Sequence, residues 1–120
     1  MTLRDCLAVA LFGMYLFVFP PRAMACDCTW YAYSALKAHG IRMQTVPSVV
    51  VTDERKYPGA YSRGVVYVKN IDDCRVRLHE FIHHVQWLKY GDAVEIHEWQ
   101  RRENQAAMIT MIVESRGACE

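Results

Sequence analysis

The sequence predicts an α+β fold, a single domain with a front helix, a small mixed sheet of about three strands and two further helices. Two long segments, 74–90 and 98–116, carry apolar residues at helical spacing. Short valine-rich runs at 48–52 and 65–68 are bounded by proline, glycine or asparagine, as strands are. The length of 120 residues suits one domain at most.

Residues 1–25 are expected to be a secretory signal peptide, which leaves 26–120 as the folded domain. Arg4 precedes an unbroken apolar run, Cys6–Phe19, and the small-residue triplet Ala23-Met24-Ala25 follows. The run of 14 residues is shorter than the roughly 20 that a membrane-spanning helix needs. After cleavage the chain would hold 12 basic and 12 acidic residues, for a net charge of zero.

The front helix is predicted over Trp30–His39. Asp27 and Thr29 are candidate N-caps, and Gly40 is placed to end the helix. Ile41–Val46 follows as a possible strand that stops before a proline.

The sheet is predicted from three further segments. Ser48–Thr52 contains three consecutive valines, a pattern typical of a buried strand. The polar segment 53–59 is expected to be a loop, followed by a short edge strand over Ala60–Arg63. Gly64 marks a turn, and Val65–Val68 is the clearest strand of the chain.

Two helices complete the domain. Asp72-Asp73 offers a cap for a helix over Cys74–Tyr90, which Gly91 ends. After a loop, the last helix is predicted over Glu98–Arg116 and is ended by Gly117.

Composition excludes several classes of function. A neutral chain without a basic run has no electrostatic footprint for nucleic acid or an anionic membrane. The sequence has no glycine-rich phosphate loop. An apolar content of 52% excludes an intrinsically disordered protein.

The cysteines indicate an exported protein. Cys6 leaves with the signal, and four cysteines remain: Cys26, Cys28, Cys74 and Cys119. An even number predicts two disulfides, with three possible connectivities, in a secreted or periplasmic protein. The alternative is a lipoprotein anchored at Cys26, which would be the first mature residue but would leave an odd number of thiols.

The segment His79-Glu80-Phe81-Ile82-His83 is an H-E-x-x-H motif on a predicted helix. Residues four apart share one helix face, so both imidazoles can bind one tetrahedral zinc ion. Glu80 would lie to the side of the metal, where its carboxylate can take a proton from an activated water.

A catalytic zinc needs a third protein ligand. The candidates downstream are Glu95, His97, Glu98, Glu103 and Glu114. Glu103 falls on the largely apolar stripe of the last helix, where an unpaired carboxylate is costly, so it is the predicted ligand. Glu98 shares its face with polar residues and is expected to be solvated. The alternative for Glu103 is an ion pair with Arg75 or Arg101.

The motif, followed twenty residues later by a helical glutamate, resembles the thermolysin-like gluzincins, and the short chain resembles their smallest members, the minigluzincins. The resemblance implies a minimal zincin-like domain with a front helix, an active-site helix and a glutamate helix. It implies zinc on His79, His83 and Glu103, with Glu80 as general base. It also implies that a peptide adds as an extra strand along Ala60–Arg63.

Two features depart from that family. Only 17 residues follow Glu103, so we expect no second lobe and no oxyanion-stabilising histidine from one. Ala107 stands where thermolysin has a carboxylate that supports a zinc ligand. Tyr61, Tyr90 and His97 are candidate oxyanion stabilisers, the last of them in the predicted loop between the two metal-binding helices.

The predicted function is a secreted, monomeric zinc metallopeptidase that acts on a peptide or protein substrate. One alternative is a non-catalytic or latent zinc-binding domain that binds a partner protein. Another is a disulfide-stabilised secreted module in which the motif is accidental.

Overall fold

The computed structural model describes residues 27–115 and confirms the α+β class, with three helices and one small mixed sheet in that range. The elements are α3 (Cys28–Ala38), β1 (Ser48–Val51), β2 (Gly59–Ser62), β3 (Val65–Val68), α4 (Cys74–Tyr90) and α5 (Ile96–Ser115). The predicted signal peptide, Cys26, Gly117 and Cys119 lie outside the described residues.

Aspartate side chains cap the first two helices. The Asp27 carboxylate accepts the backbone N–H of Trp30 at 2.8 Å, so α3 begins two residues before its predicted start. Asp73 accepts the backbone N–H of Val76 at 3.1 Å, and α4 has the bounds that the sequence predicts, with Gly91 as its C-cap at φ 77°.

The end of α3 explains why the predicted strand at Ile41–Val46 is absent, which makes that prediction wrong. Gly40, at φ 80°, donates its N–H to the Lys37 carbonyl at 2.9 Å, and Ile41 donates to the Leu36 carbonyl at 2.8 Å. These two bonds form a Schellman motif, in which the residue after the glycine belongs to the helix end. The segment up to residue 46 has no strand partner in the structure.

The sheet has the order β1-β3-β2, with β1 parallel and β2 antiparallel to β3. Arg63 and Gly64 form the turn between β2 and β3, both with positive φ, as a tight two-residue hairpin requires. The edge position predicted for the strand near residue 60 is confirmed.

The burial predicted for β1 is wrong. Val50 and Val51 are 41% and 54% exposed, because β1 is an edge strand and the sheet packs against helix on only one of its faces. A valine run looks the same in the sequence whether a strand is central or at an edge.

The last helix begins earlier than predicted. The Glu95 carbonyl accepts the N–H of Trp99 at 3.0 Å, so the first turn starts at Ile96. The prediction that His97 lies in the interhelical loop is therefore wrong: His97 is an exposed residue of the first turn of α5.

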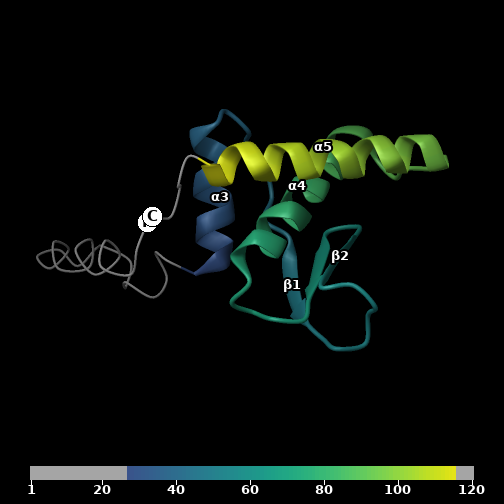
Figure 1. The fold of residues 1–120 in the computed structure, drawn as a ribbon. Coiled ribbons are helices and arrows are strands. Elements are labelled where there is room, and N and C mark those ends of the chain that lie inside the picture. The colour runs from purple at the N-terminus through teal and green to yellow at the C-terminus, as the bar shows by residue number, and fades with distance from the viewer. Residues whose placement is uncertain (1–26, 116–120) are drawn as a thin grey trace, which may run out of the picture.

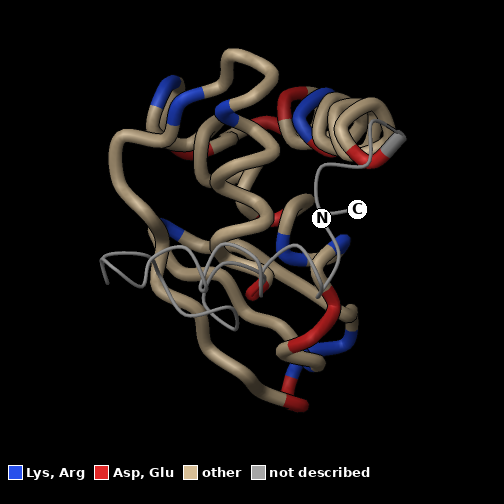
Figure 2. The backbone as a smooth tube through the Cα atoms, turned by 90° about the vertical axis from the view of Figure 1, so that its left-hand side faces the viewer, with Lys and Arg blue, Asp and Glu red and all other residues tan. Residues whose placement is uncertain are grey.

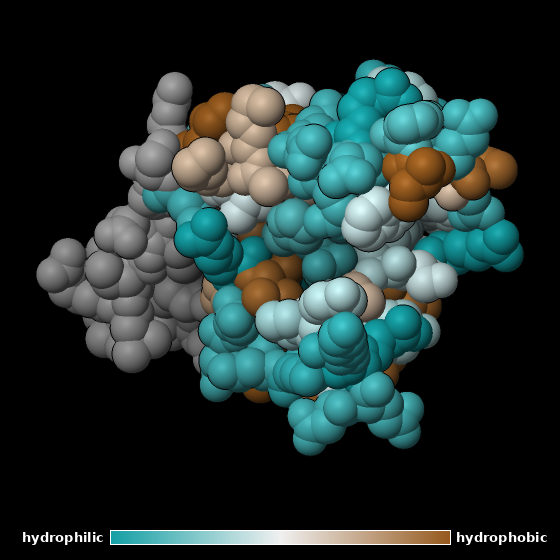
Figure 3. Space-filling view, turned by 45° about the vertical axis from the view of Figure 1, so that its right-hand side comes forward, coloured by the Kyte–Doolittle hydropathy of each residue, from teal (hydrophilic) through white to brown (hydrophobic). Residues whose placement is uncertain are grey.

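Helix α4 is the centre of the domain. Figure 1 shows α5 running across the top, α3 on one side and the sheet below, with α4 between them. The core consists of buried apolar side chains from these elements, among them Leu36, Val66, Val68, Leu78, Phe81, Ile82, Ala106 and Val113. Basic and acidic residues are scattered along the backbone, and both signs occur in several parts of the view in Figure 2. The face drawn in Figure 3 is mainly hydrophilic, with hydrophobic patches toward the top.

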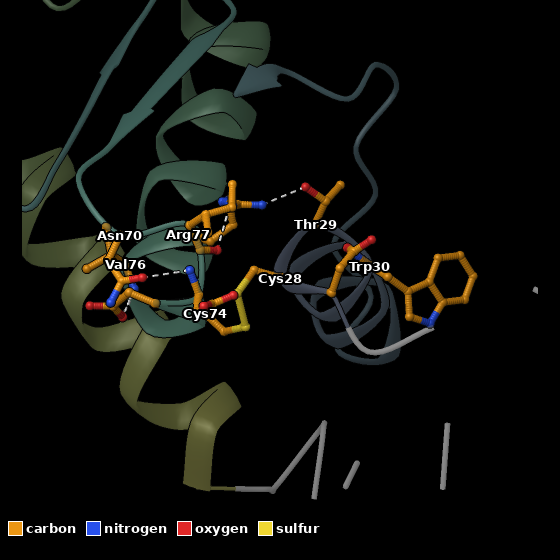
Figure 4. Close-up of a disulfide and its surroundings, with 11 residues drawn as sticks. Cys28, Thr29, Trp30, Asn70, Cys74, Val76 and Arg77 are labelled. Atoms are coloured by element: carbon orange, nitrogen blue, oxygen red, sulfur yellow. Dashed lines mark hydrogen bonds between the residues drawn. A yellow bond between two sulfur atoms is a disulfide. The ribbon is translucent and has the colours of Figure 1, made fainter. Parts of the chain in front are cut away.

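A disulfide between Cys28 and Cys74 joins the first turns of α3 and α4 (Figure 4). Beside it, the buried Arg77 guanidinium donates to the Thr29 hydroxyl at 2.7 Å and to the Ile71 carbonyl at 3.1 Å. The disulfide indicates an oxidising, extracytoplasmic compartment. No helix in residues 27–115 has the length and apolar character needed to cross a bilayer.

Candidate metal centre

The structure brings together the three side chains predicted as metal ligands. His79 and His83 lie one turn apart on α4, and Glu103 faces them from α5, which packs antiparallel to α4. The distance from His79 Nε2 to Glu103 Oε1 is 3.2 Å, and from His83 Nε2 to Glu103 Oε2 it is 2.7 Å. One potential ligand atom from each residue lies within 4.8 Å of the other two, so the three could hold one metal ion.

The orientation of His83 supports a shared metal better than a simple pair with the carboxylate. Its Nε2 atom is buried and, although close to Glu103, has no hydrogen bond of acceptable geometry. A buried nitrogen without a hydrogen bond is costly, and a metal ion would satisfy it. Two imidazoles and one carboxylate also match the three-ligand set of catalytic zinc sites, which keeps a fourth position open.

Gln86 fixes which nitrogen of His83 faces the site. Its buried amide NH₂ donates to the Arg102 carbonyl at 3.0 Å and to Gln105 Oε1 at 2.7 Å. Because a backbone carbonyl can only accept, the Gln86 oxygen must point at His83 Nδ1, 2.8 Å away. His83 Nδ1 therefore carries the proton, and Nε2 presents its lone pair to the site. Gln86 thus supplies the hydrogen-bond acceptor that orients the His83 imidazole.

Replacing Gln86 with leucine is expected to weaken metal binding about 10- to 100-fold, because the acceptor that orients His83 is lost. Gln105→Leu is the matched control, since it removes only one of the two acceptors of the Gln86 amide. Metal affinity measured by competition with a chelator tests this. Unchanged affinity in Gln86→Leu would show that the hydrogen bond does not support the site.

Glu80 is buried beside the ligands, at 7% exposure. Burial, and secondly the negative charge of Glu103, raise the pKa of the Glu80 carboxyl to about 8. The side chain packs against β2 at Gly59, where an added Cβ would lie 3.0 Å from Glu80 Oε2 and 2.4 Å from a methyl of Val76. Only glycine gives the strand this close approach, so Gly59 sets the position of the candidate base.

A cleft of about 950 Å³ contains the site. Helix α4 forms its floor, β2 and the loop before it form one wall, and α5 forms the other. An ion pair lies toward each end of the cleft. Arg63 donates to Asp92 at 2.6 Å, and Arg75 lies 3.1 Å from Glu114. The bond from Arg63 lowers the pKa of the Asp92 carboxyl.

Neither of the two arginines considered as ion-pair partners of Glu103 is paired with it in the structure. Arg75 contacts Glu114, and Arg101 contacts Glu98 at 3.3 Å. Glu98 also pairs with Arg102 at 2.9 Å and is not among the residues that could hold the metal. Glu103 therefore contacts the two histidines rather than an arginine.

The hydroxyl of Tyr61, one candidate oxyanion donor, is already bonded. His84 Nε2 lies 2.9 Å from the Thr45 carbonyl and must donate to it, so His84 Nδ1 accepts the Tyr61 proton at 2.7 Å. The same hydroxyl accepts the N–H of Gly64 at 2.7 Å. His84 is buried in this network.

The other two oxyanion candidates are not brought to the cleft. Tyr90 is 60% exposed at the end of α4, and His97 is exposed on α5; neither lines the cleft around the metal ligands.

Comparison of the chain with models of known protein families, with curated proteins and with solved structures finds no match.

Proposed function

We propose that this protein is a zinc metallopeptidase with a minimal zincin-like domain, similar in its site to the gluzincins. The observation that carries the proposal is the convergence of His79, His83 and Glu103, with the buried carboxyl of Glu80 next to them. We further propose that the chain is exported through a cleaved signal peptide and acts as a monomer. The disulfide supports a secreted or periplasmic setting for it.

In this proposal His79, His83 and Glu103 hold the zinc. When bound, zinc supplies a Lewis acid that polarises the scissile carbonyl and activates a water. Glu80 accepts a proton from the attacking water and passes it to the leaving amine. Gly59 keeps the Glu80 carboxylate against the cleft wall, beside the three metal-binding side chains.

The free edge of β2 supports a peptide as the substrate. Within residues 27–115, strand β2 pairs only with β3, and it lines the cleft along its whole length. An extended peptide can add to such an edge by main-chain hydrogen bonds, which places successive side chains on alternating sides.

Metal removal tests the proposal directly. The purified protein is expected to contain one zinc per chain and to cleave a mixed peptide library. Dialysis against a chelator should abolish cleavage, and one equivalent of zinc should restore it. Peptide cleavage that persists in the metal-free protein would contradict the proposal.

A non-catalytic zinc domain that binds a partner is the second candidate. The positions of the three candidate oxyanion stabilisers favour it. Tyr61 donates its proton to His84, and both Tyr90 and His97 lie outside the cleft. One zinc per chain without cleavage of any peptide in the library would support this candidate.

A further inference from the structure

Arg75 lies in the first turn of α4, four residues before His79, and its side chain lines the cleft. Residues four apart on a helix have Cβ atoms about 5–6 Å from each other, so the guanidinium reaches the cleft beside the metal site. Its side chain is 66% exposed, and its Nη1 atom lies 3.1 Å from Glu114 Oε1. Most of the five guanidinium donors therefore remain available to a ligand.

The other two arginines of the cleft are differently placed. Arg63 binds both oxygens of Asp92, at 2.6 and 3.3 Å. Arg102 donates to Glu98 at 3.0 Å and to the Gly91 carbonyl at 2.6 Å. Of the arginines that line the cleft in residues 27–115, Arg75 is thus the one free to receive a further carboxylate.

The strand direction decides which end of a bound peptide meets Arg75. Strand β2 runs in the same direction as α4: its first residue, Gly59, packs on Glu80, and the residue after its end, Arg63, binds Asp92 beyond the end of α4. A peptide that adds to β2 in the antiparallel sense, the more stable pairing, runs the opposite way. Its C-terminal part then points to Arg75.

We propose that Arg75 is a specificity residue that binds a carboxylate on the C-terminal side of the cleaved bond, an inference that rests on the proposed peptidase function. The substrate class is a peptide with a free terminal carboxylate, or an acidic side chain, in that position. The contact with Glu114 already places the Arg75 guanidinium within donating distance of a carboxylate oxygen. At the other end of the cleft, the Arg63 guanidinium is already bound to Asp92.

The test uses zinc-loaded protein and short peptide hydroxamates, whose hydroxamate binds the metal and whose peptide part extends on the C-terminal side. The free acid and the terminal amide form the first pair. A second pair, both amides, differs by a glutamate or glutamine side chain and so distinguishes the two sources of the carboxylate. Calorimetry gives the Kd of each probe without any need for turnover.

In at least one pair, the wild type is expected to bind the acidic probe at least about tenfold more tightly than the neutral probe, as a charge-assisted hydrogen bond allows. Arg75→Gln should remove this preference by raising the Kd of the acidic probe alone. Arg75→Lys should retain part of it, because lysine offers a point charge without the planar fork. Arg101→Gln is the matched control, since this exposed arginine does not line the cleft.

Equal affinity for acid and neutral probes in both pairs would overturn the inference, and so would a preference that survives Arg75→Gln. Failure of every probe to bind the zinc-loaded protein would overturn it as well. The peptidase proposal fails separately: a preference that depends on Arg75, in a protein that cleaves no peptide, upholds the carboxylate site and refutes the enzyme. Peptide cleavage without a preference for the acidic probes would uphold the enzyme and refute the carboxylate site.

Discussion

Glu80→Gln is expected to lower peptide cleavage by at least about 10²–10⁴-fold while one zinc per chain stays bound. The amide keeps the size and hydrogen-bonding reach of the carboxyl but cannot accept the proton of the attacking water. Glu80 is not one of the three residues that converge on the metal position, so the metal affinity should be nearly unchanged. Zinc content and cleavage rate are measured on the same preparations. Equal cleavage by both proteins would remove Glu80 from the mechanism.

The same substitution has a second readout in the metal-free protein, which follows from the raised pKa of Glu80. The unfolded chain loses this proton near pH 4.5, whereas the folded chain keeps it until about pH 8. The folded state therefore binds more protons in this window, and the free energy of unfolding falls as the pH rises through it. The decrease in the free energy of unfolding that is attributable to Glu80 is at most about 5 kcal/mol. Glu80→Gln should abolish it, so chemical unfolding at pH 5 and pH 8 gives the comparison.

Glu103→Gln is expected to lower zinc affinity sharply, by 100-fold or more in order of magnitude, because it removes the one negative charge among the three ligands. The side chain keeps its volume, so the packing of α5 on α4 should change little. Affinity is measured by competition with a chromophoric chelator, which needs no catalytic activity.

Glu98→Gln is the matched control for this ligand. Glu98 lies on the same helix, one turn and a half before Glu103, and contacts Arg101 and Arg102 rather than the histidines. Its loss should therefore leave the metal affinity unchanged. If Glu98→Gln loses the metal and Glu103→Gln keeps it, the assignment of the third ligand is wrong.

Local signals in the sequence were enough to predict the helix that bears the motif. The cap at Asp73 and the glycine at position 91 set both ends of α4. The side of α5 on which Glu103 lies is also predictable, because helical periodicity alone places it on the same stripe as the buried Ala106.

Features that depend on the partner of a residue could not be predicted in this way. Gln86 lies one helical turn after His83 in the sequence, but its role follows from the Arg102 carbonyl, which lies on another helix. The proton of Tyr61 is committed to His84, 23 residues away in the sequence. The Gly59 contact with Glu80 likewise arises only when strand and helix pack together.

The three helices are secured in different ways. The Cys28–Cys74 disulfide ties α3 to α4 covalently, whereas within residues 27–115 no disulfide reaches α5, which packs mainly on α4. A metal held by His79, His83 and Glu103 would be the corresponding clamp for α5, so that the free energy of metal binding is also free energy of folding. In an environment rich in proteases, chains without metal would be digested first. Metal scarcity would therefore shorten the lifetime of the protein as well as empty its metal site.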